Sequence, residues 1–177
     1  VWTIPAREAR PRWTGGPETP SDEPYWSKQW DLEAAYLPDA WGIGTGDGVT
    51  VAVIDTGVQC SHPDASCSTS MPHYDALTRR VVVSPVDVFG HATHVAGTIA
   101  ARFNGIGIGG GAPDADILSC RACDSGGRCA EMDVAACVVY SAPYAQVLNM
   151  SLGGGASSQT PALCQAIENA TAGGTLS

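Results

Sequence analysis

Residues 51–58 read VAVIDTGV, one of the two most informative stretches of the chain. Four apolar residues, three of them β-branched, run into an aspartate and a Thr-Gly turn, which is typical of a buried strand that ends at Asp55. In an open parallel sheet, ligands and catalytic groups collect at the carboxyl edge of the strands. The stretch therefore predicts that Asp55 is presented at such an edge.

A second stretch supplies a partner for this carboxylate. Residues 91–98 read HATHVAGT, in which a histidine opens a helical run of small residues. His91 would therefore project from a helix N-terminus toward the same sheet edge. An imidazole with a carboxylate partner is the general-base half of a Ser/His/Asp site.

Strand and helix patterns alternate along the chain, which predicts an α/β fold with a parallel sheet flanked by helices. A long loop is expected over residues 60–78, and the first 24 residues, with five prolines and no periodicity, are interpreted as a linker or propeptide remnant. The folded domain would then comprise residues 25–177. The expected strands are 49–54, 80–83, 117–122 and 146–151, and the expected helical segments are 37–41, 91–103, 131–141 and 161–172.

Charge and hydropathy exclude two classes of partner. The 177 residues carry a formal net charge of -9, whereas phosphate binding needs clustered Lys and Arg. No apolar stretch approaches the roughly 18 residues that a membrane span requires. We therefore expect neither nucleic acid nor a membrane as a partner. Val1 follows no Met or leader, which predicts a processed or truncated chain.

Seven cysteines favour an oxidising, secreted setting. Cys60 and Cys67 flank a short loop and are candidates for a local disulfide, while Cys123 and Cys129 bracket residues 124–128. The sequence leaves the connectivity open. A zinc site is a competing interpretation that lacks a histidine in the cluster. Its ligands would be Cys120, Cys123, Cys129 and Cys137.

The two opening stretches resemble the aspartate and histidine signatures of the subtilisin-like serine proteases, the subtilases, and residues 149–154 (NMSLGG) resemble the strand that lines the substrate cleft of that family. The resemblance runs from about Gln29 to the end of the chain. It implies a secreted serine endopeptidase of subtilisin-like fold, in which Asp55 orients the imidazole and His91 is the general base.

The family's turn that carries the nucleophilic serine is not in the sequence, nor is the asparagine of its oxyanion hole. The resemblance therefore implies a subtilisin-like domain that is incomplete at its C-terminus, with the nucleophile outside the chain. On this interpretation the 177 residues alone should show essentially no turnover, because removing one member of a catalytic triad costs many orders of magnitude in rate.

The resemblance also assigns a cleft that holds an extended peptide as an added strand between two glycine-rich edges. One edge would contain Ser125, Gly126 and Gly127, and the other Ser151, Leu152 and Gly153. The resemblance further implies a structural calcium site, because Asp64 and Asn104 match positions that supply side-chain oxygens to calcium in many subtilases. Gln29 would be a third ligand, and the carbonyls of Arg102, Ile106 and Ile108 would follow.

Two interpretations from other classes stay open. One is a catalytically inactive relative that binds peptides or has no function, motivated by the missing nucleophile and by Ala92, where the family usually has glycine; the added methyl group would be harmless or would crowd the cleft. The other is an aspartic protease in which Asp55 and Asp124 share a proton.

His94 lies three residues after His91 rather than at the four-residue zincin spacing, so we expect a structural histidine packed behind His91. By the resemblance, the partners would be polypeptide substrates and the protein's own propeptide. We expect a monomer.

Overall fold

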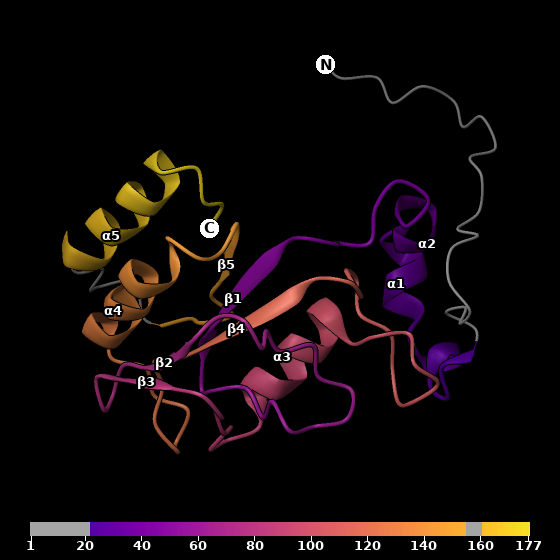
Figure 1. Cartoon of the computed structure of the whole chain (residues 1–177), viewed down its shortest axis with the longest axis horizontal. Coiled ribbons are helices and arrows are strands. Elements are labelled where there is room, and N and C mark those ends of the chain that lie inside the picture. The colour runs from indigo at the N-terminus through magenta and orange to yellow at the C-terminus, as the bar shows by residue number, and fades with distance from the viewer. Residues whose placement is uncertain (1–21, 155–160) are drawn as a thin grey trace.

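The computed structural model describes residues 22–154 and 161–177. In these residues five strands form one sheet in the order β3-β2-β4-β1-β5 (Figure 1). Neighbouring strands are parallel except for β2 and β3, which confirms the predicted parallel α/β architecture. The strands are β1 (Thr50–Asp55), β2 (His73–Asp75), β3 (Arg80–Val82), β4 (Asp116–Arg121) and β5 (Val147–Asn149).

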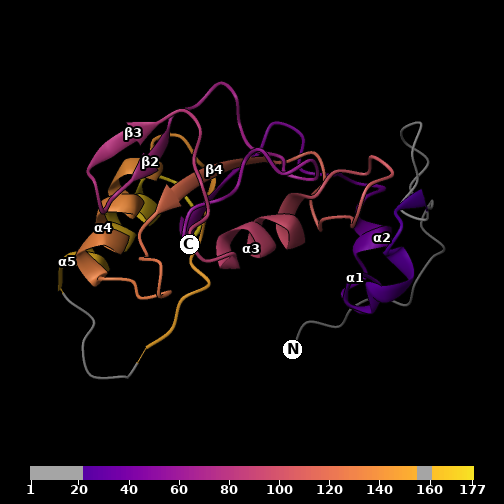
Figure 2. The same cartoon turned by 90° about the horizontal axis from the view of Figure 1, so that it is seen from below.

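Helices cover both faces of the sheet. Figures 1 and 2 show α3 on one face and the pair α4 and α5 on the other, with α1 and α2 at the far end of the molecule from α5. The helices are α1 (Trp30–Ala34), α2 (Leu37–Ala40), α3 (His91–Ala100), α4 (Glu131–Ser141) and α5 (Pro161–Ala172), and a 3-10 turn, Trp26–Lys28, precedes α1. No helix among the described residues is long and apolar enough to cross a membrane.

The alternation of side chains along β1 divides the core into two layers. Val51 and Val53 pack with Ala92 and Ala96 of α3, whereas the intervening residues pack on the α4 and α5 side. Because successive side chains of a strand point to opposite faces, Asp55 shares the α3 face with Val51 and Val53. The strand thus delivers the carboxylate to the face on which α3 begins.

The expected long loop over residues 60–78 is wrong in part, because β2 lies within it. Its register places Tyr74 opposite Cys120 and Asp75 opposite Arg121 of β4. A strand of three residues shows too little alternation to be predicted from its own sequence, and it exists here because β4 supplies a partner. The helix predicted over 91–103 ends at Ala100, since Ala101 is extended and its carbonyl accepts a hydrogen bond from Gly110 N–H at 2.8 Å.

The predicted turn at 37–41 packs an aromatic ring as expected. Trp41 is buried, its indole N–H donates to the carbonyl of Gly111 at 2.9 Å, and its ring meets Phe103 edge to face at 4.9 Å between centroids. These contacts attach α2 to the glycine-rich segment that follows α3.

Six of the seven cysteines form three disulfides: Cys60–Cys67, Cys120–Cys137 and Cys123–Cys129. The zinc interpretation is therefore wrong, because every sulfur it would need is already in a disulfide. Two of the bridges attach β4 and the segment after it to the region of α4. Cys164 lies on α5.

A glycine-to-alanine substitution tests the packing of α3. A methyl group on Gly110 would lie 2.5 to 2.7 Å from backbone atoms of Ala100 and Ala101, which cannot move without distorting the end of the helix. Gly110→Ala should therefore lower the free energy of unfolding by about 1–3 kcal/mol. Gly44→Ala is the matched control, because nothing lies within 4 Å of the added methyl group. Thermal unfolding followed by circular dichroism measures both, and equal melting temperatures would contradict the described packing.

Candidate active site

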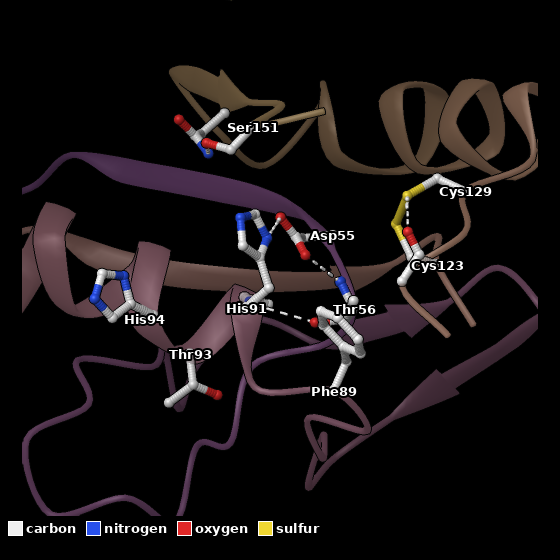
Figure 3. A network of polar contacts seen from close by, with 12 residues as sticks. Asp55, Thr56, Phe89, His91, Thr93, His94, Cys123, Cys129 and Ser151 are labelled. Atoms are coloured by element: carbon white, nitrogen blue, oxygen red, sulfur yellow. Dashed lines mark hydrogen bonds and ion pairs between the residues drawn. A yellow bond between two sulfur atoms is a disulfide. The ribbon is translucent and has the colours of Figure 1, made fainter. Parts of the chain in front are cut away.

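Asp55 and His91 are in direct contact at the carboxyl edge of the sheet. Oδ2 of Asp55 lies 2.8 Å from Nδ1 of His91, and Oδ1 accepts a hydrogen bond from the backbone N–H of Thr56 at 2.6 Å (Figure 3). The carboxylate is fully buried, whereas 44% of the imidazole side chain is exposed. With Nδ1 fixed by the carboxylate, the other ring nitrogen is left for solvent or substrate. This is the arrangement of a general base and its orienting acid.

Asp87 fixes the first turn of α3. Its Oδ2 accepts hydrogen bonds from the backbone N–H and the hydroxyl of Thr93, at 2.8 and 2.7 Å, and its Oδ1 accepts from the N–H groups of Phe89 and Gly90. The helix has no side-chain cap of its own at Gly90, so the carboxylate of Asp87 satisfies N–H groups that would otherwise lack partners.

The same aspartate connects α3 to the end of β1. The hydroxyl of Thr56 donates to Asp87 Oδ1 at 2.8 Å and accepts from the N–H of Ala92 at 3.1 Å. Burial alone would raise the pKa of Asp87, but the hydrogen bonds from Thr93, Gly90 and Phe89 outweigh it and hold the pKa below its usual value. Sequence reasoning missed this residue, because a single aspartate four residues before His91, in an irregular segment, shows no pattern that marks it as the acceptor for the helix start.

Ala92 does not crowd the cleft. The residue is fully buried and its methyl group packs in the core with Val51 and Val53, on the side of α3 that faces the sheet. Of the two outcomes considered from the sequence, the structure supports the harmless one.

Both predicted edges line one open cleft of ≈ 1540 Å³ together with Asp55 and His91. This exceeds the size of an ordinary small-molecule pocket and suits an extended ligand. Five of the six predicted edge residues line it, whereas Ser125 is exposed outside it. The five are Gly126, Gly127, Ser151, Leu152 and Gly153.

Asp124 does not pair with Asp55. Its Oδ1 accepts hydrogen bonds from the backbone N–H groups of Arg128 and Gly126, which lower the pKa of the carboxyl, and it closes a turn on the surface. His94 also differs from expectation: it is exposed rather than packed behind His91, and Figure 3 shows its ring pointing away from Asp55.

A second group of polar atoms lies around the loop of residues 104–109. Oε1 of Glu23 accepts from the N–H groups of Asn104 and Gly105, and Oδ2 of Asp64 accepts from Ile108 N–H at 3.1 Å. The other oxygen of each carboxylate, Glu23 Oε2 and Asp64 Oδ1, is buried without a hydrogen-bond partner. The loop thus engages one oxygen of each carboxylate and leaves the other without a hydrogen bond, and carboxylate oxygens are ligands that calcium prefers.

The predicted calcium ligands differ in whether their side-chain oxygens are already engaged in hydrogen bonds. Burial raises the pKa of Asp64, against the hydrogen bond from Ile108, and a cation beside the carboxylate would lower this pKa again. The amide of Gln29 is engaged at both atoms with the backbone of Gly109, at 2.8 and 2.9 Å. Within residues 22–154 and 161–177, no cluster of three or more His, Cys, Asp or Glu side chains forms a metal site, so carbonyl or amide oxygens would have to contribute. Sequence reasoning missed Glu23, which lies in the segment assigned to a linker.

Residues 46–177 match the sequence profile of the subtilase family. The chain is 39% identical over 138 residues to a thermophilic serine proteinase of Bacillus sp. (strain AK1), covering 76% of this chain and 34% of that protein. It is 38% identical over 138 residues to thermitase of Thermoactinomyces vulgaris, covering 77% of this chain and 48% of that protein. The chain thus spans a third to a half of the length of these relatives.

Solved structures of subtilisin-like proteins superpose on this chain. Fervidolysin from Fervidobacterium pennivorans, a keratinolytic enzyme related to subtilisin, superposes with a TM-score of 0.76 at 30% identity, over 87% of this chain and 24% of that one. A cold-adapted subtilisin-like serine proteinase superposes with a TM-score of 0.59 at 33% identity, over 73% of this chain and 45% of that one.

Replacing Asp87 tests the connection between β1 and α3. Asp87→Asn removes the charged acceptor of the first turn and should destabilise the protein by about 1–2 kcal/mol at neutral pH. Because the pKa of Asp87 is lowered on folding, its stabilising contribution is full above the pKa of the unfolded chain and is lost as the pH falls through the folded value. The difference from wild type should therefore shrink below about pH 4.

Denaturant titrations at neutral and acidic pH measure this difference. Asp47→Asn, on an exposed turn, is the control and should change little at either pH. A deficit for Asp87→Asn that stays constant with pH would show that the charge of this carboxylate is not what stabilises the helix start.

Proposed function

The chain belongs to the subtilase family, a family of serine peptidases, and on that premise we propose that it forms the N-terminal part of the catalytic domain of a serine-type endopeptidase. The observation that carries the proposal is the contact of 2.8 Å between Asp55 Oδ2 and His91 Nδ1 beside a long cleft. The buried carboxylate holds the imidazole in one tautomer and stabilises the imidazolium that forms when the base takes a proton.

The nucleophile in this proposal is a serine outside residues 1–177. His91 would accept its proton through the ring nitrogen that does not face Asp55, and would return the proton to the leaving amine. Acyl transfer to the serine, with release of the leaving amine, and hydrolysis of the acyl-enzyme would then follow as two steps.

Polypeptides are the proposed substrates. The cleft is bordered by Gly126 and Gly127 on one side and by Ser151 and Gly153 on the other, and glycines allow a peptide backbone to approach closely. An extended chain can therefore be held by main-chain hydrogen bonds while pockets read its side chains. The protein's own propeptide would occupy the same cleft, and a monomer suffices for this chemistry.

We also propose secretion. Three disulfides within this chain fit an oxidising compartment. A further relative, 38% identical over 128 residues, is the minor extracellular protease Epr of Bacillus subtilis (strain 168).

Mutation of the base tests the proposed reaction. In the full-length protein, His91→Ala should lower kcat/KM for a peptide substrate by about 10⁴-fold or more, because the serine then lacks its general base. His94→Ala is the matched control: it changes an exposed histidine of the same helix and should leave activity within a few-fold of wild type. Labelling with a fluorophosphonate, which reacts with an activated serine, gives a second readout. A wild-type protein that neither hydrolyses peptides nor takes the label would support the inactive relative instead.

We propose a structural calcium site built from Glu23, Asp64 and Asn104. The buried, partnerless oxygens of the two carboxylates support it. The Asn104 side-chain oxygen lies in the same loop, where it accepts a hydrogen bond from the backbone N–H of Ile106 at 2.9 Å. Carbonyls of residues 102–108 would supply further ligands. Gln29, whose amide is held by Gly109, would fix the loop rather than bind the ion.

Calcium dependence of stability tests this site. Calcium should raise the melting temperature of the wild-type protein, and chelation should lower it, since a ligand that binds only the folded state stabilises it by mass action. Glu23→Gln combined with Asp64→Asn should abolish the response. Asp31→Asn, an exposed carboxylate on α1, should leave it intact. A wild-type melting temperature that is the same with calcium and with chelator would refute the proposal.

A further inference from the structure

One of the three disulfides lies in the wall of the cleft. Cys123 and Cys129 both line it, beside Gly126 and Gly127, whereas the other four bridged cysteines do not. Figure 3 shows the bridge in the same view as Asp55 and His91. A bridge at this place bears on the shape of the cleft as well as on the stability of the fold.

Cys123 is held firmly at the base of this wall. It is fully buried, its N–H donates to the backbone carbonyl of Asp55 at 3.1 Å, and its own carbonyl accepts from Nε of Arg121 at 3.3 Å. Arg121 in turn pairs with Asp75 of β2 at 3.2 Å. One end of the bridge is therefore fixed directly to the residue that orients His91.

The segment that the bridge closes is a tight turn with an exposed tip. Asp124 N–H donates to the carbonyl of Arg128 at 2.9 Å, and Gly127 N–H donates to the carbonyl of Asp124 at 3.0 Å. The Asp124 side chain accepts from Gly126 and Arg128 at 2.8 and 3.0 Å. These bonds order the turn internally but do not attach it to the rest of the molecule. The far end of the turn is joined to Cys123 by a single antiparallel backbone bridge between Cys123 and Cys129 and by the disulfide between the same two residues, which is the covalent link.

A second contact attaches the turn on the side of α3. The space beside Gly127 is taken by the ring of Phe89, so that a methyl group there would lie 3.2 Å from a ring carbon. Phe89 precedes His91 by two residues and lines the same cleft. The turn thus contacts the segment that leads into α3, while Cys123 at its base is hydrogen-bonded to Asp55.

We propose that the Cys123–Cys129 disulfide is a positioning element for substrate: it holds residues 124–128 in place as a preformed edge for an extended peptide. This inference rests on the proposed peptidase function. A peptide that pairs with a mobile edge must order that edge on binding, which weakens affinity, whereas a preformed edge avoids this loss. The disulfide therefore acts on substrates long enough to reach the edge and has no effect on short ones.

The test compares two disulfides of similar span in the full-length protein. Cys123→Ser/Cys129→Ser removes a bridge between residues 6 apart, and the control Cys60→Ser/Cys67→Ser removes one between residues 7 apart, away from the cleft. The first should raise KM for an extended peptide about 10-fold with kcat within about twofold, since the edge must now be ordered on binding. It should leave KM for a single-residue ester unchanged, and the control should leave both unchanged. An unchanged KM for the extended peptide, or equal effects on short and long substrates, would overturn the proposal.

A second variant probes the edge with the bridge intact. Gly127 has a φ of 72°, and Gly127→Ala would both strain the backbone and press on Phe89, so KM for the extended peptide should again rise. Gly48→Ala is its control, because Gly48 has a φ of 74° and nothing within 4 Å of an added methyl group. It adds the same backbone strain away from the cleft and should leave KM unchanged.

Hydrogen exchange separates this proposal from the proposed function. If the full-length protein shows no turnover, the peptidase function fails, but the edge can still be measured with an extended peptide that carries a reduced, uncleavable bond. The peptide should protect the amides of residues 124–129 in the wild type at concentrations that leave Cys123→Ser/Cys129→Ser unprotected. Equal protection in the two proteins, or no protection in either, would refute the role of the disulfide.

Discussion

The buried carboxylate of Asp55 is the constraint on which the rest of the site depends. A charged group without exposure must have partners in the protein, and here they are Thr56 N–H and the imidazole of His91. The second of these partners sits on another element, so the start of α3 has to be held against the end of β1. Asp87 and Thr56 do this through a shared set of hydrogen bonds, in which one carboxylate both caps the helix and receives the hydroxyl that follows the strand.

The backbone of Asp55 also fixes one wall of the cleft. The chain leaves β4 at Arg121, and the next two N–H groups, those of Ala122 and Cys123, both donate to the carbonyl of Asp55. The proposed substrate edge therefore begins at the residue whose carboxylate contacts His91. The carbonyl oxygen of Asp55 thus anchors the start of the proposed edge, and the Cys123–Cys129 disulfide joins the far end of that edge to the anchored residue Cys123.

The parts that could be predicted from the sequence are those encoded locally. A short apolar run and a small-residue helix were enough to predict β1, α3 and the meeting of Asp55 with His91, because parallel strands present their carboxyl ends at one edge. Longer patterns gave α4 and α5 with correct bounds. What could not be predicted depends on contacts with residues distant in the chain. Strand β2 forms because β4 lies beside it, and Glu23 is buried against a loop more than 80 residues away. The exposure of His94 likewise depends on how the rest of the chain packs around α3.

Glu23 has one consequence for the maturation of the protein. Its carboxylate accepts hydrogen bonds from the N–H groups of Asn104 and Gly105, and the N–H of Tyr25, two residues later, donates to the carbonyl of Gly107 at 3.0 Å. Glu23 and Tyr25 therefore attach the N-terminal segment to the loop that follows α3. A protease that cut the chain at Pro24 would remove the acceptor of these two N–H groups and with it one attachment of the loop at residues 104–107. A cut on the N-terminal side of Glu23 would keep both hydrogen bonds.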